Sequence, residues 1–439
     1  MTGTAEQRST RRPGSEPPGG GTPEPPAAGP AFTRRRLLGT AGAAGAAGLV
    51  AGGAGGVLGD AVLRNGPTPL TSVGATAVPF RDGTHQAGIT TPQQARGHLV
   101  AFDLTAGQTR RNVAALMARW SATARQLVRN ERLHGDDDQI AGDAGPNSLT
   151  VTFGFGASLF AKAGLADRAP QALAPLPPFS ADALDPARSN GDLWVQIGAD
   201  DALVAFHALR VLQKTAGDTV RVRWQMNGFN RTPGATLRPV TSRNLMGQVD
   251  GTNNPRPTDP DFDRRIFVPA GGTARSPEWM AGGSYAVVRR IRMLLDSWDH
   301  LSVERQEKVI GRRKSDGAPL SGGTGTTPVD LDKRDATGAP AIAGDAHIRV
   351  AAPASNGGAA MLRRPFSYHD GISADGSPDA GLLFVCWQAD PERGFVPVQR
   401  KLDRGDGLSR FLRHESSALF AVPGAGAPGE YVGQRLLES

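Results

Sequence analysis

The sequence contains one cysteine in 439 residues, and this scarcity limits the chemistry open to the chain. A single thiol cannot form an intramolecular disulfide, and it cannot supply a cysteine-built zinc or iron–sulfur site. Cys386 stands in the apolar run 383–387, where we expect a buried strand thiol rather than a nucleophile. The remaining composition, 39% hydrophobic and 21% charged, predicts a globular chain with flexible additions.

A strong charge of one sign is also missing from most of the chain. The formal net charge is +7, but residues 1–77 hold seven Arg against three Glu and one Asp, which is +3. Only +4 is left for the rest of the chain. So small an excess does not make the basic surface that nucleic-acid-binding domains carry, and we expect no nucleic-acid partner.

The N-terminal residues lack the apolar side chains that a packed core needs. Residues 1–31 are mostly Pro, Gly, Ser and Thr, and cannot bury enough surface to offset the entropy of ordering. Residues 33–38 read Thr-Arg-Arg-Arg-Leu-Leu, and no charge occurs in residues 37–59. This pattern resembles a twin-arginine export signal. The uncharged run is long enough for a membrane anchor, but it is mostly Gly and Ala, so we expect no stable span.

We therefore expect residues 1–77 to be a disordered N-region plus a twin-arginine signal peptide. The mature protein would then be extracellular or in the cell envelope. The twin-arginine machinery moves folded chains, so a cofactor can be loaded before export. A chain without disulfides fits that order of events.

Apolar periodicity predicts a regular fold from residue 98 onward. Four strands are expected at 98–104, 149–155, 193–197 and 220–226. A first helix is expected between the first two strands, where apolar residues fall at i, i+3, i+4 and i+7, and a second one after Asp200 and Asp201. The order β-α-β-β-α-β is that of a ferredoxin-like arrangement.

The second half repeats this order less clearly. Strands are expected at 285–293, 360–368, 382–388 and 418–422, and a long surface loop at 315–344. One helix is expected to begin at Ser302 and end at Gly311, and another to begin at Asp406. We predict an α+β fold of two ferredoxin-like domains with antiparallel sheets, at 78–245 and 246–439, after the N-region.

Residues 247–255, Gly-Gln-Val-Asp-Gly-Thr-Asn-Asn-Pro, form the most specific stretch. Two glycines flank Asp250 at fixed spacing, which lets backbone approach a flat ligand while one carboxylate is held in place. Asp-Gly and Asn-Pro are also frequent loop dipeptides, so an ordinary turn is the alternative for this stretch taken alone. Farther along, His347 stands between Ala and Ile, and Arg363 follows 16 residues later. A lone histidine of this kind is more often a core residue than a metal ligand.

The ordered combination of residues 247–251, His347 and Arg363 resembles the dye-decolorizing peroxidase family. Further matches run from about residue 84 to 424, the whole predicted globular region: His85-Gln86-Ala87-Gly88-Ile89, 149–154, 285–292 with Trp298, 395–400 and 417–420. The resemblance implies an exported peroxidase whose two ferredoxin-like domains bind one haem b per chain. It implies hydrogen peroxide as oxidant and a small-molecule or surface-bound reductant, such as a dye or phenol, oxidised through a ferryl intermediate.

The resemblance also implies a role for each matching residue. His347 would be the axial iron ligand, and Asp406 would hold its second ring nitrogen, with Asp403 as a rival. Asp250 would be the distal carboxylate. Arg363 would be the distal arginine, with Arg364 as a rival. Three backbone positions would line the haem edge: Gly251, Thr252 and Asn253.

Peroxide cleavage needs one group that takes a proton from one oxygen and returns it to the other. Asp250 can do so if it is ionised, and a neighbouring Arg363 is expected to keep it so. Electrons would reach the haem at its edge or through aromatic side chains, the candidates being Trp298, Tyr368 and Trp387, although buried aromatics are usually core.

Three other functions are alternatives to peroxidase activity. One is removal of iron from haem, which exported members of the family suggest. Another is haem binding without turnover, against which the retained pair of Asp250 and Arg363 argues. The third is a zinc or copper site made of His347, His369 and Asp370, which lacks any metal-motif spacing.

Overall fold

The computed structural model describes residues 73–131, 133, 139–236 and 241–438. All of these lie within one compact unit, residues 64–439. The predicted N-region and export signal lie almost wholly outside the described residues. None of the helices in the described part of the chain combines the length and the apolar character that a membrane crossing needs.

The first half folds in the predicted order. Its strands are β3 (Arg96–Leu104), β4 (Thr150–Gly156), β5 (Leu193–Ala199) and β6 (Val220–Phe229), and its helices are α2 (Arg110–Val128), α3 (Ala157–Lys162) and α4 (Ala202–Ala216). A short hairpin, β1 (Arg81–Asp82) and β2 (His85–Gln86), precedes them. Helix α4 begins as expected, because the Asp201 carboxylate accepts the amides of Leu203 and Val204.

The second half repeats the pattern with shorter helices. Its strands are β7 (Ser284–Met293), β8 (Leu362–Arg363), β9 (Phe366–Ile372), β10 (Pro378–Gln388) and β11 (Leu412–Val422). Its helices are α5 (Phe262–Ile266), α6 (Leu295–Asp299), α7 (Val303–Ile310), α8 (His347–Val350) and α9 (Phe395–Gly405), and α10 (Gln434–Leu437) ends the chain. No helix or strand occurs between α7 and α8, as the glycine-rich composition predicts.

Two expectations for the second half were wrong. The single strand expected at 360–368 is divided into β8 and β9, because Pro365 has no amide hydrogen to continue the ladder. The helix expected to begin at Asp406 is absent. Instead, Asp406 is the C-cap of α9, which begins at Phe395. Helix α7 is as predicted, with the Ser302 side chain accepting the Arg305 amide and Gly311 ending the helix at φ +91°.

The strands of the two halves form one nine-stranded sheet within the described residues. Its order is β7-β11-β4-β5-β3-β6-β9-β10-β8, and every pair is antiparallel. Each half has the strand order of a ferredoxin-like sheet, which confirms the predicted fold class. The halves meet where β4 pairs with β11 and β6 with β9. Because β7 also pairs with β10, the sheet closes into a ring. The domain boundary that we predict between residues 245 and 246 stays a prediction.

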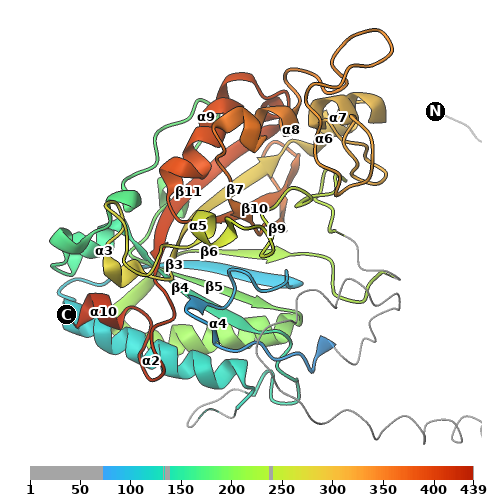
Figure 1. The fold of residues 1–439 in the computed structure, drawn as a ribbon. Helices are drawn as coiled ribbons and strands as arrows, with labels where there is room; N and C mark the ends of the chain where they lie inside the picture. The colour runs from blue at the N-terminus through green and yellow to red at the C-terminus, as the bar shows by residue number, and fades with distance from the viewer. Residues whose placement is uncertain (1–72, 132, 134–138, 237–240, 439) are drawn as a thin grey trace, which may run out of the picture. The chain divides into compact units, whose positions relative to one another are not determined.

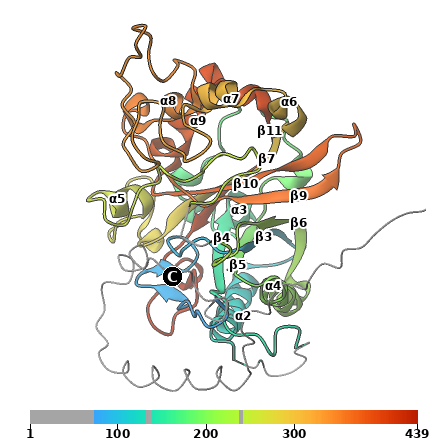
Figure 2. The same cartoon turned by 90° about the vertical axis from the view of Figure 1, so that its right-hand side faces the viewer.

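Three apolar clusters fill the spaces around this ring. One draws on strands of both halves and includes Trp194, Trp387 and Phe420. The largest extends beneath α2 and α4, around Trp120 and Phe153. Helices α2 and α4 pack side by side against the first half, while α6 to α9 gather on the opposite side of the ring, over the second half (Figures 1 and 2). A third, smaller cluster around Trp298 lies there.

Candidate active site

A cavity of about 330 Å³ lies among the elements of the second half. Its walls come from the turn 246–255, from β7, β10 and β11, and from α8 and α9. Every site residue predicted from the sequence lines it: Asp250, Gly251, Thr252, Asn253, His347, Arg363 and Asp406. The fold therefore collects residues from positions 250 to 406 around one space.

His347 is the first residue of α8, and its ring is held by Asp406. Nδ1 lies 3.0 Å from Asp406 Oδ2. The Asp406 carboxylate is itself fixed, because it accepts the amide of Leu408 at 3.1 Å and the hydroxyl of Ser409 at 3.3 Å. The rival Asp403 instead accepts from Ser180 Oγ at 2.7 Å. The geometry therefore selects Asp406 as the partner of His347.

The environment of His347 suits a metal ligand. The Asp406 side chain is only 2% exposed, whereas 32% of the His347 side chain is accessible although the residue lies deep in the protein. Burial alone would lower the pKa of His347, but the Asp406 carboxylate outweighs it and raises the pKa above its ordinary value. A carboxylate on Nδ1 increases the basicity of the ring and leaves Nε2 available to a ligand in the cavity.

The turn that carries Asp250 depends on its glycines. Gly247 and Gly251 adopt φ values of +78° and +92°, which side chains rarely tolerate. The Asp250 amide donates to the Ser242 carbonyl at 3.0 Å and so fixes the backbone. Within the described part of the chain, the Asp250 carboxylate has no hydrogen bond or ion pair, so it is available to a ligand.

Asn254 joins this turn to Arg363. Its Nδ2 donates to the Arg363 carbonyl at 2.7 Å, and its Oδ1 accepts the Arg363 amide at 3.1 Å. The Arg363 guanidinium lines the cavity without a partner among the described residues. The expected ion pair between Asp250 and Arg363 is not formed, although both side chains line the same space. The sequence analysis did not predict a role for Asn254. Its position in the same turn as Asp250 could have indicated one.

Arg364 points away from the cavity and has a structural role. It donates to the Gly88 carbonyl, to the Pro92 carbonyl at 3.0 Å and to Gln94 Oε1 at 3.0 Å. The residue is 7% exposed, and burial lowers the pKa of its guanidinium to about 10. Alternation along the strand thus sends the two adjacent arginines to opposite faces, and Arg363 is the one on the cavity.

Two further cavity residues were not predicted, Arg289 and His414. The Arg289 side chain is fully buried and binds Asp182, but its Nε and Nη1 have no hydrogen-bond partner among the described residues. His414 Nδ1 is also buried without a partner. Burial, followed by the nearby Arg289, lowers the pKa of His414 to about 3, so the ring is neutral. Charged residues inside the apolar strand 284–293 were the signal that could have revealed Arg289.

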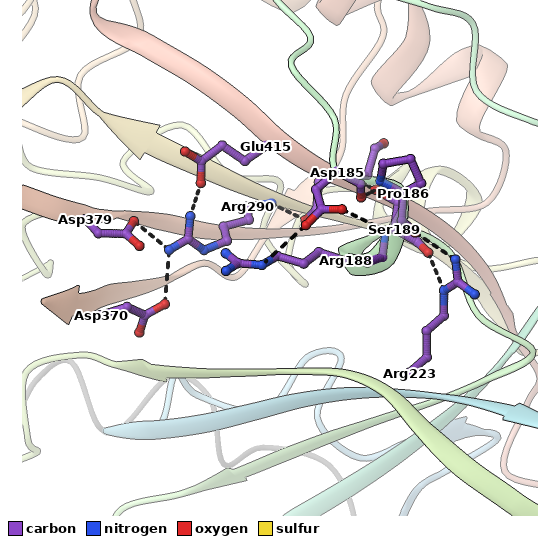
Figure 3. Close-up of polar contacts among 12 residues, drawn as sticks. Asp185, Pro186, Arg188, Ser189, Arg223, Arg290, Asp370, Asp379 and Glu415 are labelled. Carbon is purple, nitrogen blue, oxygen red and sulfur yellow. Dashed lines mark hydrogen bonds and ion pairs between the residues drawn. The ribbon is translucent and has the colours of Figure 1, made fainter. Parts of the chain in front are cut away.

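Arg290, the next residue, faces the other side of β7. It binds Glu415 of β11, Asp379 of β10 at 2.6 Å and Asp370 of β9 at 3.0 Å (Figure 3). Its guanidinium also lies 4.0 Å above the Tyr368 ring centroid. Arg290 thus joins three strands, whereas Arg289 presents unpaired nitrogens to the cavity.

The remaining predicted residues are core residues by position. Trp298, Tyr368 and Trp387 are fully buried, and Cys386 is a buried free thiol as expected. Burial raises the pKa of the Cys386 thiol, which argues against a nucleophile. No group of three or more metal-ligating side chains occurs within the described residues, so the zinc or copper alternative has no support in the geometry.

Comparisons with known proteins show which family the chain resembles. The family model "Dyp-type peroxidase, N-terminal" matches residues 86–230, and "Dyp-type peroxidase, C-terminal" matches residues 241–427. The chain is 48% identical over 376 residues to a dye-decolorizing peroxidase of Thermobifida fusca, which covers 83% of this chain and 85% of the relative.

Two other relatives extend the comparison. The chain is 37% identical to the deferrochelatase of Escherichia coli K12, over 81% of this chain and 86% of the relative. It is 67% identical to the solved structure of ferric DtpA from Streptomyces lividans, with a TM-score of 0.82, covering 85% of this chain and all of that one.

Proposed function

This chain belongs to the dye-decolorizing peroxidase family, and we propose that it is an exported haem b peroxidase that oxidises one-electron donors with hydrogen peroxide. The observation that carries the proposal is the content of the cavity. An imidazole held by a carboxylate, a carboxylate without a partner and a guanidinium without a partner line one space, on His347, Asp250 and Arg363.

Haem b needs a nitrogen ligand for its iron and polar partners for its carboxylates, and the residues of the cavity can provide both. His347 offers one nitrogen to iron while Asp406 fixes the other. Arg289 and His414 hold buried nitrogens without partners, which the carboxylates of a porphyrin would satisfy. Apolar side chains such as Ile291 line the remaining wall. The Streptomyces lividans relative is described as ferric, in agreement with iron in this cavity.

When bound, haem b supplies the iron at which peroxide binds and the electrons that reduce it. His347 would hold that iron through Nε2, and Asp406 keeps the ring oriented. Asp250 would take the proton from one peroxide oxygen and return it to the other oxygen, which leaves as water. Arg363 stabilises the negative charge on the departing oxygen. Asn254 keeps the turn of Asp250 and the backbone of Arg363 in register.

The test is stopped-flow measurement of the reaction with peroxide in an Asp250→Asn variant. An amide cannot accept the proton, so the rate should fall by about two to four orders of magnitude. Asp263→Asn, an exposed neighbour, should behave like wild type. A wild-type rate in Asp250→Asn would assign the proton transfer to water or Arg363.

Export is the second part of the proposal. It rests on Arg34 and Arg35 before a weakly apolar run and on the absence of disulfide potential. Replacement of both arginines by Lys should retain the precursor, with its haem, in the cytoplasm. Unchanged export of that variant, followed by fractionation and immunoblotting, would contradict a twin-arginine route.

The deferrochelatase relative gives a second candidate, removal of iron from haem with the porphyrin left intact. Metal-free porphyrin fluoresces whereas haem does not. Incubation of the protein with haem and a reductant should therefore show porphyrin fluorescence if this activity is present. Its absence under conditions where peroxide is consumed would leave the peroxidase as the function.

A further inference from the structure

A second cavity, of about 880 Å³, lies beside the first. The two cavities share lining residues at Arg265, Ala359 and Ala360. Gly357 and Gly358, on the segment that joins α8 to β8, also line the second cavity. A molecule bound there would contact the segment that connects His347 to Arg363. We call this space the arginine cleft, after its lining residues Arg264, Arg265, Arg275 and Arg393.

The arginine cleft keeps an excess of positive charge after its ion pairs are counted. Asp390 is bound by Arg275 at 2.9 Å. Asp261 is shared by two arginines, at 2.7 Å from Arg265 and 3.5 Å from Arg264. The exposed Arg393 has no side-chain partner among the described residues, and Glu392 is the one further acid among the lining residues. Four arginines and two carboxylates, those of Asp390 and Glu392, therefore line the cleft, and Asp261, which does not line it, offsets one further charge.

The residues that line the arginine cleft also restrict the chemical class of ligand that it can bind. Guanidinium groups bind carboxylates and sulfonates through paired hydrogen bonds and also stack on aromatic rings. The other walls are small or apolar, with Pro269 and Pro397 among them. Gly357 and Gly358 are exposed, and an added Cβ there would meet nothing within 4 Å, so no protein atom blocks a ring beside these two lining residues.

We propose that the arginine cleft binds the reducing substrate, and that this substrate is an anionic aromatic, such as a phenol bearing a sulfonate or carboxylate. The inference rests on the proposed peroxidase function and adds to it the place and the charge of the donor. Each bound phenol gives up one electron and its hydroxyl proton and leaves as a phenoxyl radical. Two such phenols and one hydrogen peroxide yield two radicals and two water molecules.

The experiment compares two phenols of opposite charge, 4-hydroxybenzenesulfonate and tyramine. The holoprotein is altered by Arg264→Glu and Arg393→Glu together. Two charge reversals at a partly exposed site should weaken binding of the sulfonate by roughly tenfold. Calorimetric titration without peroxide and the steady-state KM should both show this loss. Tyramine should lose nothing, and the loss for the sulfonate should shrink in high salt.

The control double variant is Arg111→Glu with Arg119→Glu, on the exposed face of α2, which changes the net charge by the same amount. It should leave sulfonate binding unchanged. Equal weakening by both double variants, or none by either, would overturn the inference. The rate of reaction with peroxide is measured in the same samples. If the protein binds the sulfonate through the cleft but does not react with peroxide, the proposed peroxidase function is contradicted. The proposed binding site is still supported in that case.

Discussion

The two halves of the molecule share one strand order but differ in what covers their sheets. In the first half, β3 turns Val100, Phe102 and Leu104 toward α2 and α4, which are 19 and 15 residues long and seal an apolar core. In the second half, the matching face of β7 carries Arg289 and Ile291, and these line the cavity. There α7 and α9 are only 8 and 11 residues long. The cavity therefore occupies the place that long apolar helices fill in the other half.

The largest expected effect separates cofactor binding from stability. His347→Ala should abolish the axial bond and most haem occupancy, because His414, the other described histidine that lines the cavity, has no carboxylate on its ring. The fold should survive, since the ring is one contact of a large core. The Soret absorbance per protein and the thermal midpoint measure the two effects.

A matched change in the first half should do the reverse. Met117→Ala removes a fully buried side chain beneath α2 and should destabilise by about 2–5 kcal/mol with an unchanged spectrum. A His347→Ala protein with a histidine-ligated spectrum would make another residue the ligand, and the exposed His369 would be tested next.

The next effect contrasts the adjacent arginines. Arg363→Leu should bind haem yet react with peroxide about two to three orders of magnitude more slowly. Arg364→Leu should keep the rate but lose about 1–3 kcal/mol of stability, because the hydrogen bonds to the Gly88 and Pro92 carbonyls and to the buried Gln94 Oε1 are lost. Stopped-flow rates and denaturant titrations distinguish them. The opposite pattern would assign the distal role to Arg364.

A smaller effect is expected at the partner of the axial histidine. Asp406→Asn should weaken haem binding by about 10- to 100-fold, because the amide no longer accepts the charge-assisted bond from Nδ1. Asp403→Asn should leave haem affinity unchanged, since its carboxylate binds Ser180 instead. Haem transfer to apomyoglobin measures both. Equal losses in the two variants would indicate a general effect of the α9 end.

The last effect concerns acid stability. His414 has a pKa of about 3 in the folded protein against an ordinary 6.5, so between these values the unfolded chain binds one more proton. Stability should therefore fall as pH drops from 6.5 toward 3, by up to about 1.4 kcal/mol per unit, and be unaffected above 6.5. His414→Gln should flatten this slope, whereas His369→Gln on the surface should not. Thermal midpoints of the purified protein across this range provide the measurement.

The sequence predicted the regular elements better than it predicted the cavity. Periodicity located the strands of both halves because buried and exposed positions alternate along them. It failed near Asp406, where a polar segment with a good N-cap residue proved to be a helix end. The resemblance supplied the site residues that the structure brings together. Asn254, Arg289 and His414 were missed, because their roles depend on contacts between segments far apart in the chain.

The closed ring of strands makes the two halves inseparable. Taken apart, the first half would expose the backbone amides and carbonyls of β4 and β6, and the second half those of β9 and β11. Unpaired edges of this kind recruit strands from other molecules and lead to aggregation. Phe366 of β9 also packs directly over Gly97 and Gly228 of the first half, where an added Cβ would come within 2.6 Å of the Phe366 ring and within 2.4 Å of its Cβ, respectively. Neither half should be soluble when expressed alone, although each contains a complete ferredoxin-like unit.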